Sequence, residues 1–83
     1  MVKILFFGDL VETLGMASDE VNLPPDVTDV ERLLFVLSKR GEMWKKMLLG
    51  NPKLNVTVNK QFAEKSAAIQ DGDEIALVGL SMA

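Results

Sequence analysis

The sequence predicts an α+β fold in which a mixed β-sheet curls over one main helix. The chain has 83 residues, and the 48% that are hydrophobic suffice for one modest core, so we expect a single domain over residues 1–83. Apolar, strand-like runs stand near both ends, at residues 2–7 and 75–78, and one long amphipathic helical pattern lies between them, at residues 28–40. Packing one sheet against that helix is the economical way for so short a chain to bury both.

The first strand is expected at residues 2–7, which are rich in branched and aromatic side chains and are followed by Gly8 and Asp9. Successive side chains of a strand point to opposite faces. The side chains expected in the core are Val2, Ile4 and Phe6, and those expected on the other face are Lys3, Leu5 and Phe7. Phe7 therefore needs a cover, which either another part of this chain or a binding partner would supply.

A short helix is expected after this strand. Asp9 is a suitable N-cap, Glu12 stands at the capping-box spacing behind it, and Gly15 is a suitable C-terminal stop. The apolar side chains of this helix would be Leu10, Val11 and Leu14. Residues 16–19 then read as a loop, and residues 20–23 alternate polar and apolar side chains until two prolines end what we expect to be an edge strand.

The main helix begins with the clearest local signal in the chain, a capping box. Thr28 is expected to accept a hydrogen bond from the N–H of Glu31, while the side chain of Glu31 reaches back to the cap. One apolar face follows at helical spacing and consists of Val30, Leu33, Leu34 and Leu37. Two basic residues suit the C-terminal end of the helix dipole, and Gly41 is expected to form a left-handed cap.

A second, shorter helix is expected at residues 42–49. Its apolar side chains would be Met43, Trp44, Met47 and Leu48. A stripe of Trp and Met at this spacing is more often part of a core than of a ligand pocket. We therefore expect this helix to pack against the sheet beside the main one.

The C-terminal third predicts strands. Residues 54–58 alternate in the pattern of a strand with one buried face, Asn59 and Lys60 read as a turn, and residues 61–63 are expected to pair back. Asp71-Gly72 then turns the chain into the final strand, whose inner side chains would be Ile75 and Leu77. The β-grasp fold has this order of elements, with its first and last strands adjacent and parallel in the middle of the sheet.

The composition excludes most catalytic chemistry. Without Cys or His the chain has no thiolate nucleophile, no imidazole base and neither of the usual zinc ligands. Asp73 and Glu74 are adjacent on a strand and would point to opposite faces, so we expect no catalytic or metal site there. A net charge of −3 argues against nucleic-acid binding, and no apolar run approaches the roughly 20 residues of a membrane span. We read no signal peptide and expect a small, acidic, cytoplasmic binding module.

Five short segments carry a resemblance to a known family. They are Val2-Lys3-Ile4-Leu5-Phe6-Phe7-Gly8, Glu12-Thr13-Leu14-Gly15, Thr28-Asp29-Val30-Glu31, Val58-Asn59-Lys60 and Asp71-Gly72-Asp73-Glu74-Ile75-Ala76. Together, in this order and at fitting intervals, they resemble the MoaD/ThiS family of sulfur carriers over essentially the whole chain. The resemblance is to the MoaD branch, the small subunits of molybdopterin synthase.

This resemblance implies a β-grasp, or ubiquitin-like, fold and a carrier subunit that is not an enzyme by itself and binds no cofactor. In the family, a MoeB-like activating enzyme uses ATP and a sulfur donor to convert the C-terminal carboxylate into a thiocarboxylate. The C-terminal tail then enters the large, MoaE-like subunit of molybdopterin synthase and donates sulfur in molybdenum cofactor biosynthesis. The resemblance implies Ala83 as the sulfur-bearing end and, as partner-binding residues, Phe7, Phe62, Val78, Leu80, Ser81 and Met82, of which the last three lie in a projecting tail at residues 80–83.

The printed C-terminus departs from the family pattern. The family ends in Gly-Gly, which suits a narrow channel because no Cβ obstructs the backbone, whereas this sequence ends in Leu80-Ser81-Met82-Ala83. Two hypotheses stay open. The chain is either a MoaD-like sulfur carrier or a β-grasp protein-interaction module that keeps the docking face but is not competent to carry sulfur.

Overall fold

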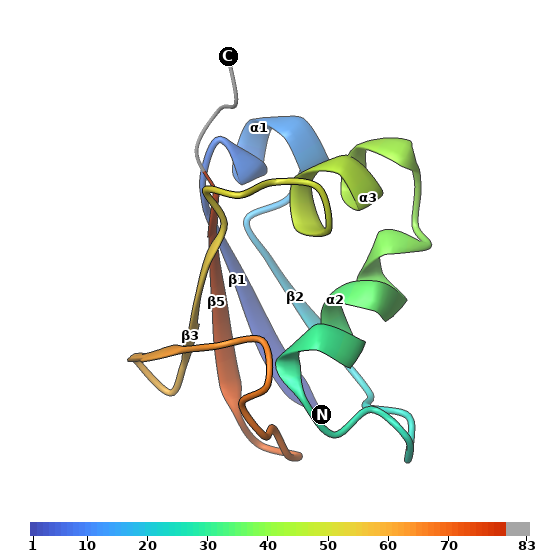
Figure 1. Cartoon of the computed structure of the whole chain (residues 1–83), viewed down its shortest axis with the longest axis vertical. Coiled ribbons are helices and arrows are strands. Elements are labelled where there is room, and N and C mark those ends of the chain that lie inside the picture. Colours follow the sequence, from blue (N-terminus) through green and yellow to red (C-terminus); the bar gives the residue numbers. More distant parts are fainter. Residues whose placement is uncertain (80–83) are drawn as a thin grey trace.

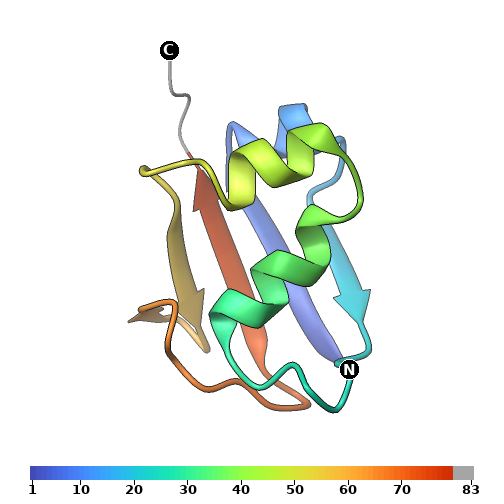
Figure 2. The same cartoon turned by 45° about the vertical axis from the view of Figure 1, so that its right-hand side comes forward.

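A five-stranded mixed sheet and three helices form two layers in this computed structural model, which describes residues 1–79. The elements are β1 (Val2–Gly8), α1 (Leu10–Leu14), β2 (Ser18–Val21), α2 (Val30–Ser38), α3 (Glu42–Leu48), β3 (Asn55–Val58), β4 (Gln61–Ala63) and β5 (Glu74–Gly79). The helices lie on one face of the sheet, and α2 crosses it diagonally (Figures 1 and 2).

The order of strands across the sheet is β2-β1-β5-β3-β4. The first and last strands, β1 and β5, are parallel neighbours, and the other pairs are antiparallel. This arrangement confirms the predicted β-grasp topology. The two edge strands are short, with four residues in β2 and three in β4.

The core lies between the sheet and the helices, as the alternation in the sequence predicts. Its sheet side includes Val2, Ile4, Phe6, Val56, Ile75 and Leu77, and its helix side includes Leu10, Val30, Leu33, Leu34, Leu37, Met47 and Leu48. Trp44 of α3 packs edge-on against Phe6, with ring centroids 5.6 Å apart. The predicted core role of the Trp and Met stripe is therefore confirmed, except that Met43 is exposed.

The main helix begins one residue later than the capping box predicts. Asp29, not Thr28, is the N-cap: its backbone is extended, and its Oδ1 accepts a hydrogen bond from the N–H of Arg32 at 2.8 Å. The segment before it is held in an extended form, because the carbonyl of Thr28 accepts a hydrogen bond from Ile69 and Asp29 forms a β-bridge with Ala68. Tertiary pairing thus overrides the local signal and moves the start of the helix.

Two other predicted helix signals are wrong, and one is confirmed. Asp9 precedes α1 but makes no side-chain cap, because its own backbone is helical, with φ −71° and ψ −11°, whereas a capping residue is extended. Gly41 has an extended φ of 162° and begins α3, so it is not the left-handed cap of α2. Gly15 does end α1 in the left-handed region, with φ 77°.

The strand boundaries differ from the prediction mainly in β2. This strand begins at Ser18, inside the expected loop, because Ser18 pairs with Leu5 of β1. The predicted turn between β3 and β4 is confirmed: Asn59 and Lys60 both have positive φ, at 51° and 70°. Two left-handed residues are what a two-residue hairpin needs in order to follow the twist of its strands.

Candidate functional site

The candidate site is the outer face of the sheet, which the helices leave uncovered (Figure 2). The strand register sorts its side chains into two rows. In one row Phe7 of β1 stands opposite Val78 of β5, which stands opposite Asn55 of β3. The second row crosses four strands and consists of Leu5, Ala76, Thr57 and Phe62. We call these seven residues the docking face.

The two phenylalanines of the docking face are more exposed than the residues between them. Phe7 is 47% exposed and Phe62 is 86% exposed, whereas Leu5, Ala76 and Val78 are half-buried. Nothing in residues 1–79 covers Phe7 fully, so its predicted need for a cover is met only in part within this fold. Two large exposed apolar side chains, with half-buried apolar side chains between them, make this face the candidate for protein binding.

Three of the predicted partner-binding residues, Phe7, Val78 and Phe62, lie on the same face but do not form one cluster. Phe7 and Val78 are direct neighbours across the parallel β1–β5 pair. Phe62 lies three strands away from β1, and with neighbouring strands about 4.8 Å apart this spans roughly 14 Å. A partner that contacts both phenylalanines must therefore cover most of the width of the sheet.

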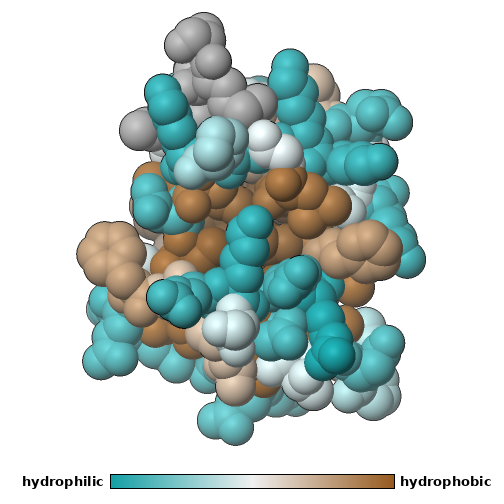
Figure 3. Space-filling model, in the orientation of Figure 1, coloured by the Kyte–Doolittle hydropathy of each residue, from teal (hydrophilic) through white to brown (hydrophobic). Residues whose placement is uncertain are grey.

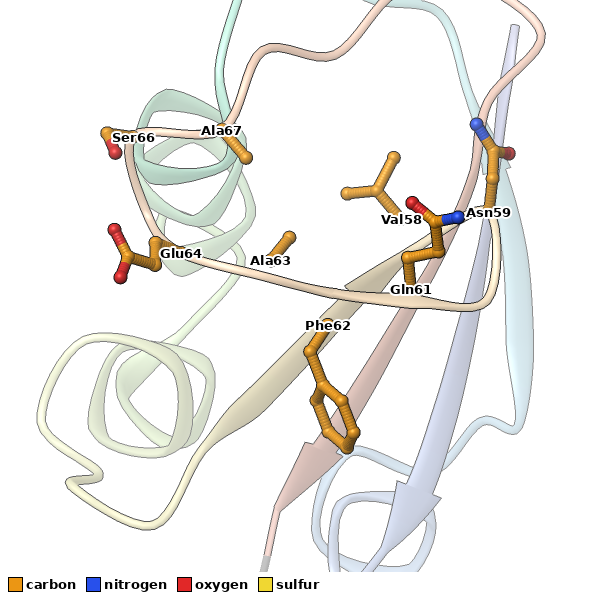
Figure 4. A pocket seen from close by; sticks show the side chains of 8 residues that line it. All are labelled: Val58, Asn59, Gln61, Phe62, Ala63, Glu64, Ser66 and Ala67. Atoms are coloured by element: carbon orange, nitrogen blue, oxygen red, sulfur yellow. The ribbon is translucent and has the colours of Figure 1, made fainter.

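Phe62 projects from the edge strand β4 and is flanked by open hollows. Figure 4 shows Phe62 on the opposite side of the hairpin from Val58 and Ala63, as the pairing of Phe62 with Thr57 requires. A hollow of about 510 Å³ lies between β4 and residues 64–67, and another of about 560 Å³ is lined by Leu54 and Val56 of the β3 segment. Figure 3 shows the molecule from the same direction as Figure 1, and in this view hydrophobic surface lies in the middle between hydrophilic ends.

The acidic turn before β5 is held by side-chain hydrogen bonds. Asp73 accepts hydrogen bonds from the side chain of Asn59 at 3.0 Å and from the backbone N–H of Gln70 at 2.9 Å. The side-chain oxygen of Asn59 in turn accepts from the N–H of Glu74 at 3.0 Å. These bonds join the β3–β4 turn to the start of β5, and no group of three or more acidic residues within residues 1–79 is arranged to hold a metal ion.

The end of β5 is buried, unlike the half-buried Val78 before it. Gly79, its last residue, is buried, and its carbonyl accepts a hydrogen bond from the N–H of Asp9 at 2.8 Å. The remaining predicted site residues, Leu80, Ser81, Met82 and the sulfur-bearing Ala83, lie outside the residues that the structure describes.

Sequence reasoning missed the middle of the docking face. Leu5, Ala76 and Thr57 fill the space between Phe7 and Phe62, and only the strand register shows that they share one row with Phe62. Alternation along β1 placed Leu5 on the correct face, but the pairing of β5 with β3 could not be read from either strand alone. None of the helices within residues 1–79 has the length and apolar character needed to cross a bilayer.

Comparisons with known proteins agree with this fold. Residues 4–79 match the ThiS family. The molybdopterin synthase sulfur carrier subunit of Haemophilus influenzae is 32% identical over 76 residues, which cover 92% of this chain and 90% of that protein. Small archaeal modifier protein 1 of Haloferax volcanii has a similar structure, with a TM-score of 0.77 at 25% identity over 96% of this chain and 97% of that one. A chain from the complex of subunits 1 and 2 of the molybdopterin-converting factor of Helicobacter pylori gives a TM-score of 0.65 at 20% identity, covering 99% of this chain and 96% of that one.

Proposed function

The chain belongs to the ThiS family, and from that premise we propose that it is the sulfur carrier subunit of a molybdopterin synthase. The observation that carries the proposal is the 32% identity to a molybdopterin synthase sulfur carrier subunit over 92% of this chain. The structure supports it with an exposed sheet face suited to protein docking, in a chain without Cys or His.

In this proposal the chain carries sulfur on its C-terminal carboxylate. An activating enzyme joins the carboxylate to the AMP part of ATP and releases pyrophosphate. A sulfur donor then delivers sulfide to the acyl carbon, AMP leaves with the bonding electron pair, and a thiocarboxylate forms. Donation of the sulfur to a pterin precursor, with water replacing it, restores the carboxylate. In the printed sequence that carboxylate belongs to Ala83.

The docking face would serve both protein partners in turn. Phe7 and Phe62 are the exposed anchors, and Val78 lies between them at the end of the strand that leads to the C-terminus. Buried aromatic anchors provide a large part of the binding energy at protein interfaces. A MoeB-like activating enzyme and a MoaE-like large subunit would therefore bind one after the other, because each needs the same face.

The decisive experiment measures sulfur on the C-terminus. The chain is incubated with a MoeB-like activating enzyme, ATP and a sulfur donor, and intact-mass spectrometry detects the exchange of one oxygen for sulfur. A matched variant carries Ala83→Gly with one more glycine appended, which restores the family's ending. Omission of ATP is the control for both chains.

The outcomes separate the two hypotheses that the sequence leaves open. ATP-dependent sulfur gain by the printed chain supports the carrier proposal. Gain by the glycine-ended variant alone supports the interaction module, in which the docking face works but the printed end does not carry sulfur. If neither chain gains sulfur while the activating enzyme modifies a known carrier, the proposed function is wrong.

A further inference from the structure

The last residue of β5 is held by a backbone contact with the turn that follows β1. Gly8 and Gly79 are partners at the end of the parallel β1–β5 ladder, and the next bond runs from the N–H of Asp9 to the carbonyl of Gly79, at 2.8 Å. Gly8 is in the left-handed region, with φ +68°. A Cβ added at Gly8 would collide with the carbonyl oxygen of Gly79, so only glycine permits this approach.

Gly79 also packs closely against the side chain of Leu10. A Cβ at Gly79 would stand 2.8 Å from both Cγ and Cδ2 of Leu10. Leu10 is fully buried in α1, so its side chain has no free space into which to move. Gly79 is therefore fixed between the backbone of the β1–α1 turn and a core side chain.

Both neighbouring strands end at this point. On one side β1 turns away into α1 after Gly8, and on the other side β3 begins at Asn55, opposite Val78. Gly79, the last residue of β5, is paired with Gly8 and bonded to Asp9. The direction of the backbone at Gly79 is set by Gly8, Asp9 and Leu10.

We propose that Gly8, Asp9 and Leu10 are positioning residues that fix the position and direction of the backbone at Gly79, from which the chain continues to its C-terminal carboxylate. This inference rests on the proposed function, since it assigns these residues to the presentation of the C-terminal carboxylate to the activating enzyme. Their proposed role is to orient the backbone at Gly79, not to bind the carboxylate or ATP. We expect their effect in the chemical step after docking, because Gly79 and Leu10 are buried, whereas the adjacent Phe7 and Val78 face outward.

The structure offers a matched pair of variants. Gly8→Ala forces a methyl group against the carbonyl of Gly79, whereas Gly15→Ala adds a methyl group at a similar φ of +77° with no atom within 4 Å. Both variants carry left-handed backbone strain, but only the first disturbs Gly79. A second pair is Gly79→Ala, which collides with Leu10, and the double variant Gly79→Ala/Leu10→Ala, in which the collision is removed.

The first measurement compares kcat and KM for ATP-dependent adenylation by the MoeB-like enzyme. Gly8→Ala is expected to lower kcat about tenfold or more while KM for the carrier stays unchanged, because small misplacements of a reacting group cost rate steeply. Gly15→Ala is expected to leave both constants unchanged, and Leu10→Ala is expected to restore part of the kcat lost in Gly79→Ala. Equal kcat for Gly8→Ala and Gly15→Ala, or a loss confined to KM, would overturn the proposal.

The second measurement does not depend on sulfur chemistry. Amide hydrogen exchange reports the bond from the Asp9 N–H to Gly79, which should be protected in the parent chain and in Gly15→Ala but not in Gly8→Ala. If the parent chain is never adenylated yet shows this pattern, the proposed function fails and the positioning geometry stands. An unprotected Asp9 amide in the parent chain would reject the positioning role whatever the activity.

Discussion

The two faces of the sheet are built from the same strands and differ in what covers them. On the inner face Phe6 is 2% exposed and Leu77 is fully buried, whereas the next residues along the chain, Phe7 and Val78, face outward beside each other. Alternation along β1 and β5 thus buries one set of side chains in the core and leaves the other set on the proposed docking face. Substitutions on the two faces should therefore change different measured quantities.

The largest effect is expected on the inner face. Leu77→Ala should lower the free energy of unfolding by about 3 kcal/mol, because it leaves a cavity at a fully buried position in the central strand. Val78→Ala, one residue further on and half-buried, should lower it by about 1 kcal/mol or less. Urea unfolding measures both, and similar losses for the two variants would contradict the division between the faces.

The next effect concerns binding. Phe7→Asp should weaken binding to a MoaE-like or MoeB-like partner about tenfold or more, because a charge replaces an apolar anchor at the interface. Phe35→Asp is the matched control, since Phe35 is an exposed phenylalanine at 55%, compared with 47% for Phe7, but it lies on α2. Calorimetric titration of each variant gives the affinity. Equal losses for both would mean that the outer face has no special part in docking.

Phe62 tests whether the docking face reaches the edge of the sheet. Phe62→Ser should change the free energy of unfolding by no more than about 0.5 kcal/mol, because 86% of the residue is exposed. Its partner affinity should fall by less than that of Phe7→Asp, since no charge is introduced. An unchanged affinity would confine the docking face to β1 and β5.

The smallest effect is a gain in stability at the hairpin that carries Phe62. Lys60→Gly should raise the free energy of unfolding by about 0.5 kcal/mol, because Lys60 has a φ of 70° and glycine adopts this conformation without a Cβ clash. Partner affinity should not change, since the register of β4 is preserved. Asn59→Gly is the contrasting variant: it removes the hydrogen bonds to Asp73 and Glu74 and should be destabilising.

The fold could be predicted from the sequence because the strongest sequence patterns show which side chains are buried. Ile4 and Ile75, predicted to face the core from the first and last strands, are both fully buried. The ends of the helices were less predictable. The helix α2 starts after Asp29 because distant residues near Ala68 hold the preceding segment extended, and no local pattern contains that contact.

The candidate site was predictable to a smaller degree. Alternation placed Phe7 on the outer face and left open whether this chain or a partner covers it, and only the family resemblance made it a partner-binding residue. Phe62 came only from the family resemblance, because β4 is three residues long and its pattern is too short to show a face. The contact of Gly8 with Gly79 was invisible in the sequence, where the two glycines stand at opposite ends of the chain.

The central place of β5 also bears on how the chain folds during synthesis. β5 joins β1 on one side and β3 on the other, so until it is made the sheet exists only as separate β1–β2 and β3–β4 pairs. Isolated two-stranded pairs are marginally stable at best, and contacts between distant segments form slowly. The ribosome must therefore deliver the chain through β5 before the five-stranded sheet forms, and we expect a product truncated within β5 to be unfolded and open to proteolysis.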